Sequence, residues 1–424
     1  MNKKDQNTQK KSVKGWLVLL VSGLLCIAIA VVYRFVLNKD EISEVPLDPT
    51  QTIEGENSKE KATVQEPTKE AIIDFSDFMP SRQEVSTVFK TQAPIRGIFL
   101  TANTAGIETS LDKLIQLADE TEINAFVIDV KNDDGNITFD INVPLVDEIG
   151  SEDRAIRNIN IVMDKLYNHN IYPIARIVAF KDPYLSSHVT DYAIKNADGS
   201  LFYYKKISWL NPYNKDCWKY IIDVAKEAAK AGFKEIQFDY IRFEATHSLD
   251  NANFGETNNL TRMDVIASFI DYAKTELKPY DVVVSADVFG TIIESEVDAK
   301  MIGQNYQEMA KRLDVICPMV YPSHYGRGYF GLPSTEPPDL HPYEIIFGSM
   351  QASNEVLMDV VENKAIVRPW LQAFTASYLG SGEYMTYDGS AIRKQIQGAY
   401  DAGLTEWLLW NAGNRYSSDG LQPQ

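Results

Sequence analysis

"EIQFDYIRFE", residues 235–244, has the composition of a buried β-strand, because β-branched and aromatic residues fill most of it. Asp239 lies in the middle of this run, and Arg242 follows it in the same segment. A carboxylate in a buried strand costs free energy unless a partner or a function compensates for it. Asp239 is therefore either half of a structural ion pair, with Arg176 or Arg242, or a catalytic group.

Strand-like runs recur along the chain on both sides of this stretch. The others are at residues 95–102, 124–131, 172–180, 281–290, 314–321, 366–374 and 406–413. Segments with helical periodicity separate them, and three of these begin at the capping residues Ser110, Asp216 and Asp388. Strands that alternate with helices indicate parallel βα units. Eight strands over about 320 residues predict an α/β fold, a (β/α)₈ TIM barrel over residues 94–416. A doubly wound open sheet is the alternative, but no G-x-G-x-x-G follows the first strand.

Composition restricts the class of protein. The chain has 424 residues, of which 45% are hydrophobic and 24% charged, as in a globular protein with a large core. Its formal net charge of −18 argues against a nucleic-acid partner, because binding phosphate requires a basic surface. The cysteines are Cys26, Cys217 and Cys317, and their spacing fits neither a disulfide framework nor a zinc site. We expect no metal and no cofactor.

The N-terminal segment has the pattern of a membrane anchor. Residues 1–14 contain five lysines, and the uncharged run "GWLVLLVSGLLCIAIAVVY" follows from Gly15 to Tyr33. This run is long enough to cross a bilayer, and the preceding lysines predict that residues 1–14 are a cytoplasmic tail. We therefore expect a single-pass cell-membrane protein, with a transmembrane anchor at 15–37 and an extracellular barrel. The alternative is secretion after cleavage of a signal peptide, for which Ala28 and Ala30 could form the site.

Two further segments are predicted to lie outside the barrel. Residues 38–93 are acidic, rich in Glu, Thr and Pro, and poor in aromatic residues. Such a composition cannot bury enough apolar surface to fold, so it predicts a disordered spacer. Residues 417–424 are expected to form a C-terminal tail.

The predicted barrel indicates which side chains at the strand ends face its interior. In TIM barrels the chemistry lies at the carboxyl ends of the strands, where side chains alternate between the interior and the helices. Asp239 and Asp287 end the fourth and fifth strands, face inward and are the predicted catalytic pair. The predicted substrate-binding residues are Asp129, Lys131, Arg176, Trp209, Asn211, Arg242, Tyr321, His324, Trp370, Gln372, Trp410 and Asn411.

Structural roles are the alternatives for these residues. Asp129 could simply pair with Lys131, two positions further along the same strand face. Asp287 could cap a turn. Trp370 and Trp410 could be ordinary barrel packing, and His324 could be a polar loop residue.

Several motifs together resemble a known family. The run "WLNPYNKDCWKYIIDVAKEAAKAGFKEIQFDYIRF" resembles the putative glycosyl hydrolase domain of membrane-anchored or secreted bacterial proteins. The motifs "RGIFLTANTAG", "VIDVKNDDG", "ARIVAFKDP", "SADVFG", "CPMVYPSHY" and "RPWLQAF" extend the resemblance from Arg96 to Asn414. The strand-end acids are also distantly similar to those of amylase-like retaining glycosidases. The chain departs from that pattern, since Asp287 stands where those enzymes carry glutamate, and it lacks the chitinase D-x-D-x-E. Glu244 and Glu294 are therefore alternative acids.

The chemistry of glycoside hydrolysis matches this set of residues. It requires two carboxyl groups, one as proton donor and one as nucleophile or base. Asp239 would stay ionised beside an arginine, whereas Asp287 would need a raised pKa to donate a proton. We therefore expect a glycoside hydrolase acting on a cell-envelope or extracellular polysaccharide. The alternatives are a metal-dependent hydrolase or lyase that uses Asp129 with these two residues, and a non-catalytic carbohydrate-binding barrel.

Overall fold

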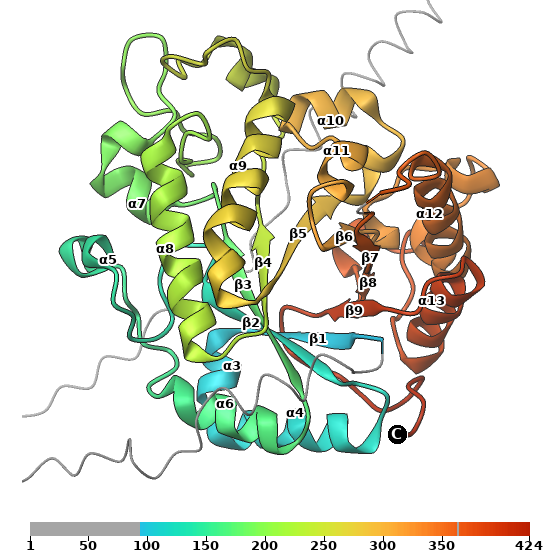
Figure 1. The fold of residues 1–424 in the computed structure, drawn as a ribbon. Helices are drawn as coiled ribbons and strands as arrows, with labels where there is room; N and C mark the ends of the chain where they lie inside the picture. The colour runs from blue at the N-terminus through green and yellow to red at the C-terminus, as the bar shows by residue number, and fades with distance from the viewer. Residues whose placement is uncertain (1–93, 363) are drawn as a thin grey trace, which may run out of the picture. The chain divides into compact units, whose positions relative to one another are not determined.

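The predicted barrel is present in the structure, a computed structural model that describes residues 94–362 and 364–424 (Figure 1). The strands are β1 (Arg96–Leu100), β2 (Ala125–Lys131), β3 (Tyr172–Val178), β4 (Glu235–Asp239), β5 (Val283–Phe289), β6 (Val315–Met319), β7 (Ile366–Val367), β8 (Trp370–Gln372) and β9 (Trp407–Trp410). All neighbouring strands pair in parallel, in the order β5-β4-β3-β2-β1-β9-β8-β6-β7. Pairing of β5 with β6 closes this sheet into a barrel.

The predicted basic tail, anchor and spacer lie outside the described residues. Among the residues that are described, none of the helices is both long and apolar enough to cross a bilayer.

Helices follow the strands and surround the barrel. They are α3 (Ala102–Gly106), α4 (Glu108–Glu120), α5 (Pro144–Ile149), α6 (Ile159–Asn168), α7 (Pro183–His188), α8 (Lys215–Ala231), α9 (Arg262–Leu277), α10 (Glu296–Ile302), α11 (Tyr306–Ala310), α12 (Pro342–Val356) and α13 (Gly389–Asp401). Asp388 caps α13, as predicted. The cap of α8 is Asn214, whose side chain accepts from the backbone N–H of Asp216. Ser110 lies inside α4 and is not its cap.

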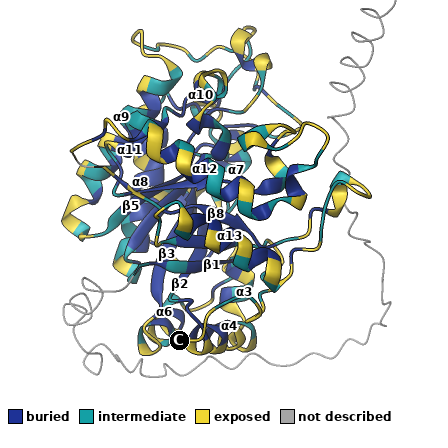
Figure 2. Cartoon of the chain, turned by 90° about the vertical axis from the view of Figure 1, so that its right-hand side faces the viewer, coloured by how far each residue is buried: buried dark blue, intermediate teal, exposed yellow. Residues whose placement is uncertain are grey.

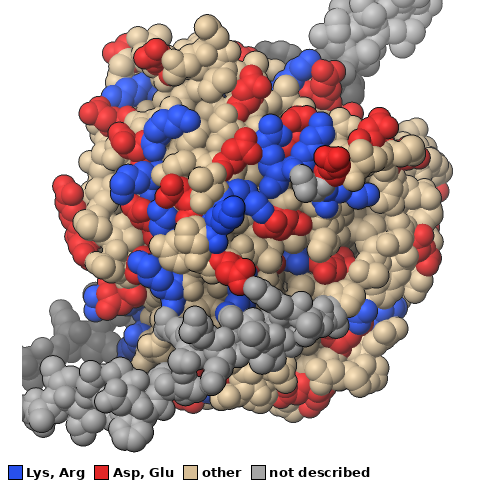
Figure 3. All heavy atoms as spheres, in the orientation of Figure 1, with Lys and Arg blue, Asp and Glu red and all other residues tan. Residues whose placement is uncertain are grey.

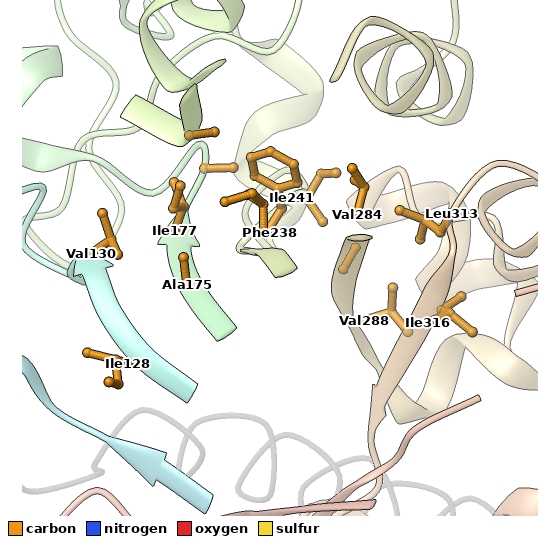
Figure 4. Close-up of a cluster of buried hydrophobic side chains, with 14 of the residues drawn as sticks. Ile128, Val130, Ala175, Ile177, Phe238, Ile241, Val284, Val288, Leu313 and Ile316 are labelled. Atoms are coloured by element: carbon orange, nitrogen blue, oxygen red, sulfur yellow. The ribbon is translucent and has the colours of Figure 1, made fainter. Parts of the chain in front are cut away.

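Strand side chains divide between two apolar layers. On β4, Phe238 (Figure 4) and Ile236 belong to the large outer cluster between strands and helices. This cluster also includes Phe269 of α9. The barrel interior holds a smaller cluster that includes Val127 and Cys317. Most strand residues, except those of β7, are accordingly dark blue, or buried, in Figure 2. This alternation directs Asp239 into the interior.

The seventh barrel strand is interrupted, whereas the sequence predicted one strand over 366–374. The break falls at Arg368 and Pro369, between β7 and β8. Proline has no N–H to donate to a ladder, which favours a break at this position. Arg368 turns inward at the break and pairs with Glu235 at 2.8 Å and with Glu406 at 2.8 Å. This ion-paired group fills the amino end of the barrel.

The C-terminal residues pair with the barrel, although a tail was predicted for 417–424. Pro423 forms an antiparallel bridge with Thr121, and the carbonyl of Gln422 accepts from the N–H of Glu122 at 2.8 Å.

On the face shown in Figure 3, acidic and basic side chains are interspersed and form no continuous basic patch.

Candidate active site

Arg176 is the centre of the polar group at the barrel mouth, where the carboxyl ends of the strands meet. Its Nη1 donates to Asp129 Oδ1 at 2.7 Å, and its Nε and Nη2 donate to Asp239 Oδ2 at 2.9 and 2.6 Å. Nη2 also donates to Asp133 Oδ2 at 2.9 Å. The β2–β3 register places Asp129 opposite Arg176, which is 1% exposed. One buried guanidinium therefore holds three carboxylates.

Asp239 is held by the backbone as well as by Arg176. The N–H of Tyr240 donates to Asp239 Oδ1 at 2.6 Å. Tyr240 has a φ of +47°, a left-handed conformation that is unusual for an aromatic residue. The strand ends here, although the sequence predicted that it continues to 243. Backbone strain of this kind is typical of functional sites.

Asp287 lies on the neighbouring strand in a drier environment. It is 1% exposed, and Trp370 Nε1 donates to its Oδ1 at 2.6 Å. Burial raises the pKa of Asp287 well above its usual range, and the negative charge of Asp239 adds to this effect. The bond from Trp370 and the charge of Arg176 act in the opposite direction. The group is therefore suited to hold its proton to a higher pH than an ordinary aspartic acid.

Asp129 and Asp133, the other two carboxyl groups bonded to Arg176, have pKa values shifted in opposite directions. Burial raises the pKa of Asp129 to about 6, in spite of the opposing effect of Arg176. Burial acts in the same direction on Asp133, but Arg176 and Lys181 outweigh it and lower the pKa of Asp133. Lys181 Nζ donates to Asp133 Oδ1 at 2.8 Å and lies 4.5 Å from the centre of the Tyr240 ring.

Asp133 and Lys181 were missed by the sequence analysis. Both lie within motifs quoted there, "VIDVKNDDG" and "ARIVAFKDP", in the loops that follow β2 and β3. Their position just beyond a strand end is the signal that could have identified them.

Aromatic side chains flank the polar group. Phe99 and Trp410 stack with their ring centres 4.0 Å apart, and the Arg176 guanidinium lies 5.3 Å from the Trp410 ring. Trp370 meets Trp410 edge to face. Trp410 keeps part of its surface exposed.

Another aromatic group follows β6. The Tyr321 ring packs edge to face against His324 and Phe374. Tyr321 is buried, Phe374 is half-buried and His324 is exposed. Tyr321 is within electrostatic range of Asp287, so the structure brings this predicted residue to the mouth.

Lys131 does not face the site, contrary to the expectation that it shares a strand face with Asp129. The β2–β3 register shifts between these two residues. Lys131 Nζ lies 2.8 Å from Asp182 Oδ2 and donates to the carbonyl of Val178 at 2.7 Å, and its side chain is fully buried. The alternative of an Asp129–Lys131 ion pair is therefore wrong, because the partner of Asp129 is Arg176.

Arg242 and Trp209 pack together against Tyr240, at the edge of the polar group. The Arg242 guanidinium lies 5.0 Å from the Trp209 ring and 4.5 Å from the Phe289 ring. Its Nη1 donates to the carbonyl of Phe243 at 2.8 Å. Arg242 therefore makes no ion pair with Asp239, because β4 has ended before it. Trp209 is 1% exposed and offers no open ring face.

Three predicted amide residues hold loops together. Gln372 Nε2 donates to Asp339 Oδ1 at 2.8 Å, and Gln372 is fully buried. Asn211 Nδ2 donates to the carbonyl of Phe254 at 2.9 Å. Asn411 Nδ2 donates to the carbonyl of Ala373 at 2.7 Å. Asn211 also lines a cavity of about 320 Å³ between the loops that follow β3 and β4.

Glu244 and Glu294, the alternative acids, lack the burial and the tryptophan hydrogen bond of Asp287. Glu244 Oε1 accepts from the N–H of Ala245 at 2.8 Å and lies 4.0 Å from Arg242. Glu294 is exposed in the loop after β5.

A metal site was an alternative for the strand-end aspartates. In the described part of the chain, no three or more His, Cys, Asp or Glu side chains are grouped so as to hold a metal ion. The charge of Arg176 lies between Asp129 and Asp239 and would oppose a cation there.

Comparisons with known proteins identify the family. Residues 97–416 match a family model described as "Putative glycosyl hydrolase domain". A comparison with curated proteins gave no match. The glycoside hydrolase domain of PgaB (BpsB) from Bordetella bronchiseptica is similar in structure, with a TM-score of 0.55, 14% identity, and coverage of 75% of this chain and 94% of that domain. This similarity supports the fold.

Two other solved structures are similar over part of the chain. A hypothetical protein from Ruminiclostridium thermocellum is 41% identical, with coverage of 45% of this chain and 97% of that protein and a TM-score of 0.42. The spore cortex-lytic enzyme SleL of Bacillus cereus is 12% identical, with coverage of 77% and 73% and a TM-score of 0.46. Because the family model spans nearly the whole barrel, this chain belongs to the putative glycosyl hydrolase domain family and is a glycoside hydrolase.

Proposed function

We propose that this enzyme hydrolyses a cell-envelope or extracellular polysaccharide, with Asp239 as nucleophile or base and Asp287 as proton donor. One observation carries the proposal: two carboxyl groups end adjacent strands of one barrel in opposite environments. Asp239 accepts hydrogen bonds on both oxygens, from Arg176 and from the backbone of Tyr240. Asp287 is buried against Trp370, and its pKa is raised. Two carboxyl groups whose environments differ in this way can take the separate acid and base roles of a glycosidase.

The strand spacing favours a retaining reaction. Neighbouring strands lie about 4.8 Å apart, and retaining glycosidases hold their two carboxyl groups about 5 Å apart. Asp239 would attack the anomeric carbon while Asp287 protonates the leaving oxygen. The charge of Asp239 contributes to the raised pKa of Asp287. Once Asp239 is esterified this charge is lost, so the pKa of Asp287 falls and the residue can act as base for the attacking water.

The charge and shape of the mouth favour a neutral or amino sugar. The polar group contains four carboxyl residues, Asp129, Asp133, Asp239 and Asp287, and the two cationic residues Arg176 and Lys181. An excess of carboxylates disfavours a strongly anionic polymer. The exposed part of Trp410 and the rings of Tyr321 and Phe374 provide apolar surface for sugar rings to stack on.

The test is an activity assay with variants. The purified full-length chain would be incubated with a panel of envelope polysaccharides and exopolysaccharides, and new reducing ends would be measured. We expect cleavage of one polymer by the wild type and loss of cleavage in Asp239→Asn and Asp287→Asn. Retention of a polymer on the protein without new reducing ends would favour a carbohydrate-binding barrel instead.

The cellular location is a separate part of the proposal. It is supported by the lysines of residues 1–14 and the uncharged run from Gly15 to Tyr33. Protease added to intact cells should then remove the barrel and leave a short membrane-bound fragment. Recovery of the intact barrel in the medium, with its N-terminus near Val31, would indicate a cleaved signal peptide.

A further inference from the structure

A second polar group lies in the barrel interior, next to Arg176 and its carboxylates. Gln237 of β4 and Ser285 of β5 are opposite each other in the strand register. Asp287 lies two residues beyond Ser285 and therefore faces the same way. Cys317 of β6 is opposite Asp287. These four side chains are at most 1% exposed.

Three atoms of this group have unused hydrogen-bonding capacity. Gln237 Nε2 donates to Cys317 Sγ at 3.2 Å, and Asp287 Oδ1 accepts from Trp370. Within residues 94–424 as described, Gln237 Oε1, Ser285 Oγ and Asp287 Oδ2 are buried without a hydrogen-bond partner. Buried polar atoms are almost always bonded to protein or to an ordered water molecule. Three such atoms on neighbouring strands, facing one interior, require a shared explanation.

We propose that Gln237, Ser285 and Asp287 bind one internal water molecule, and that this water fixes the carboxyl group of Asp287 as the acid of the reaction. The inference rests on the proposed function, in which Asp287 donates the proton. Internal water molecules typically make about three hydrogen bonds to buried polar groups, the number offered here.

The chemistry of the three atoms sets the direction of the bonds. Gln237 Oε1 can only accept, so it receives a hydrogen of the water. The water oxygen then has lone pairs directed toward the remaining partners. Because Trp370 already bonds to Oδ1, Oδ2 is the oxygen free to carry the proton of Asp287, and before substrate binds it donates that proton to the water. The carboxyl group then turns to deliver the proton to the leaving oxygen at the mouth. Gln237 and Ser285 are thus positioning residues that favour the protonated form of Asp287.

The surroundings of Asp287 agree with this arrangement. The charged or titratable groups that face it are Arg176, Glu235, Asp239, Cys317 and Tyr321. Burial and the carboxylates raise the pKa of Asp287, whereas Trp370 and Arg176 lower it. A water that accepts a hydrogen bond from the protonated Oδ2 also raises the pKa of Asp287.

The test uses the full-length chain and compares Gln237→Met and Ser285→Ala with Cys317→Ala. The two test variants remove partners of the water, and the control removes only the sulfur bonded to Gln237 Nε2. Infrared spectroscopy would follow the C=O stretch of protonated Asp287, identified by its loss in Asp287→Asn. We expect this band to move to higher wavenumber in both test variants, because the carboxyl group loses a hydrogen bond, and to stay in place in the control.

The pH profile of kcat/KM provides a second measurement, on the polysaccharide that the reducing-end assay identifies. Its alkaline limb should move to lower pH by about one unit in Gln237→Met, the equivalent of one hydrogen bond to the protonated form. An unchanged band and an unchanged profile in both test variants would overturn the inference. If Asp287→Asn also lost activity in that case, the proposed function would stand without it. An active Asp287→Asn would instead contradict the proposed function itself.

Discussion

Replacing Asp239 by Asn separates its two possible roles, since the change removes the charge and keeps the shape. The variant should fold, bind oligosaccharide and fail to cleave it. Loss of one partner from a buried ion pair typically costs about 3–5 kcal/mol. Arg176 keeps Asp129 at 2.7 Å and Asp133 at 2.9 Å in this variant. The asparagine oxygen can still accept from Arg176, so we expect a cost of about 1–2 kcal/mol.

Glu235→Gln is the matched control for this prediction. Glu235 is fully buried and accepts two bonds from Arg368, at 2.8 and 3.0 Å, which leaves only Glu406 as a charged partner. The group lies at the amino end of the barrel, and of the influences on the pKa of Asp287 the charge of Glu235 is weaker than burial, Asp239, Trp370 and Arg176. We expect this variant to lose about 3 kcal/mol or more and to keep its activity per folded molecule.

Denaturant unfolding and the reducing-end assay would be measured on both variants. We expect Glu235→Gln to have the lower free energy of unfolding and to remain active. We expect Asp239→Asn to be the more stable of the two variants and to be inactive. Cleavage by Asp239→Asn at close to the wild-type rate would refute the catalytic role. Loss of the folded state in Asp239→Asn, with Glu235→Gln still folded, would show that Asp239 is mainly structural.

Three further predictions follow from the site. Because burial raises the pKa of Asp129 to about 6, its stabilising contribution is complete below about pH 4 and is lost as the pH rises to 6. The free energy of unfolding of wild type relative to Asp129→Asn should therefore fall across this window, by about 3 kcal/mol at most. Since Tyr240 has a φ of +47°, Tyr240→Gly should be more stable to denaturant than Tyr240→Ala, by about 1 kcal/mol. Asp287→Asn should recover its first step on an aryl glycoside with a good leaving group, seen as a burst of released phenol, because that step needs no proton donor.

The strands and their inward positions were predictable because the barrel repeats one simple pattern. Strand alternation alone placed Asp239 and Asp287 on the interior of neighbouring strands. The strand and side-chain predictions depend only on local periodicity. The break at Pro369 was missed, because 366–374 was taken as one strand although proline lacks the N–H that a ladder needs.

The errors occur where the backbone leaves the regular pattern. Lys131 follows a register shift in β2, so counting by two assigned it to the wrong face. Arg242 follows the left-handed Tyr240, after which strand alternation no longer applies. Asp133 and Lys181 lie in loops, whose path is set by tertiary contacts and not by periodicity. The candidate site was therefore predicted only where regular strands provide its residues.

Comparison of the two ends of the barrel supports the proposal that the mouth is the functional end. Each end buries one arginine among carboxylates, Arg368 at the amino end and Arg176 at the mouth. At the amino end two carboxylates suffice, and none of Glu235, Arg368 and Glu406 has a positive φ. The mouth has a third carboxylate on its arginine, the strained Tyr240, and an acid on the adjacent strand with a raised pKa. An ion pair that only closed a barrel would require none of these additional costs, so their presence at the mouth supports the proposed catalytic role.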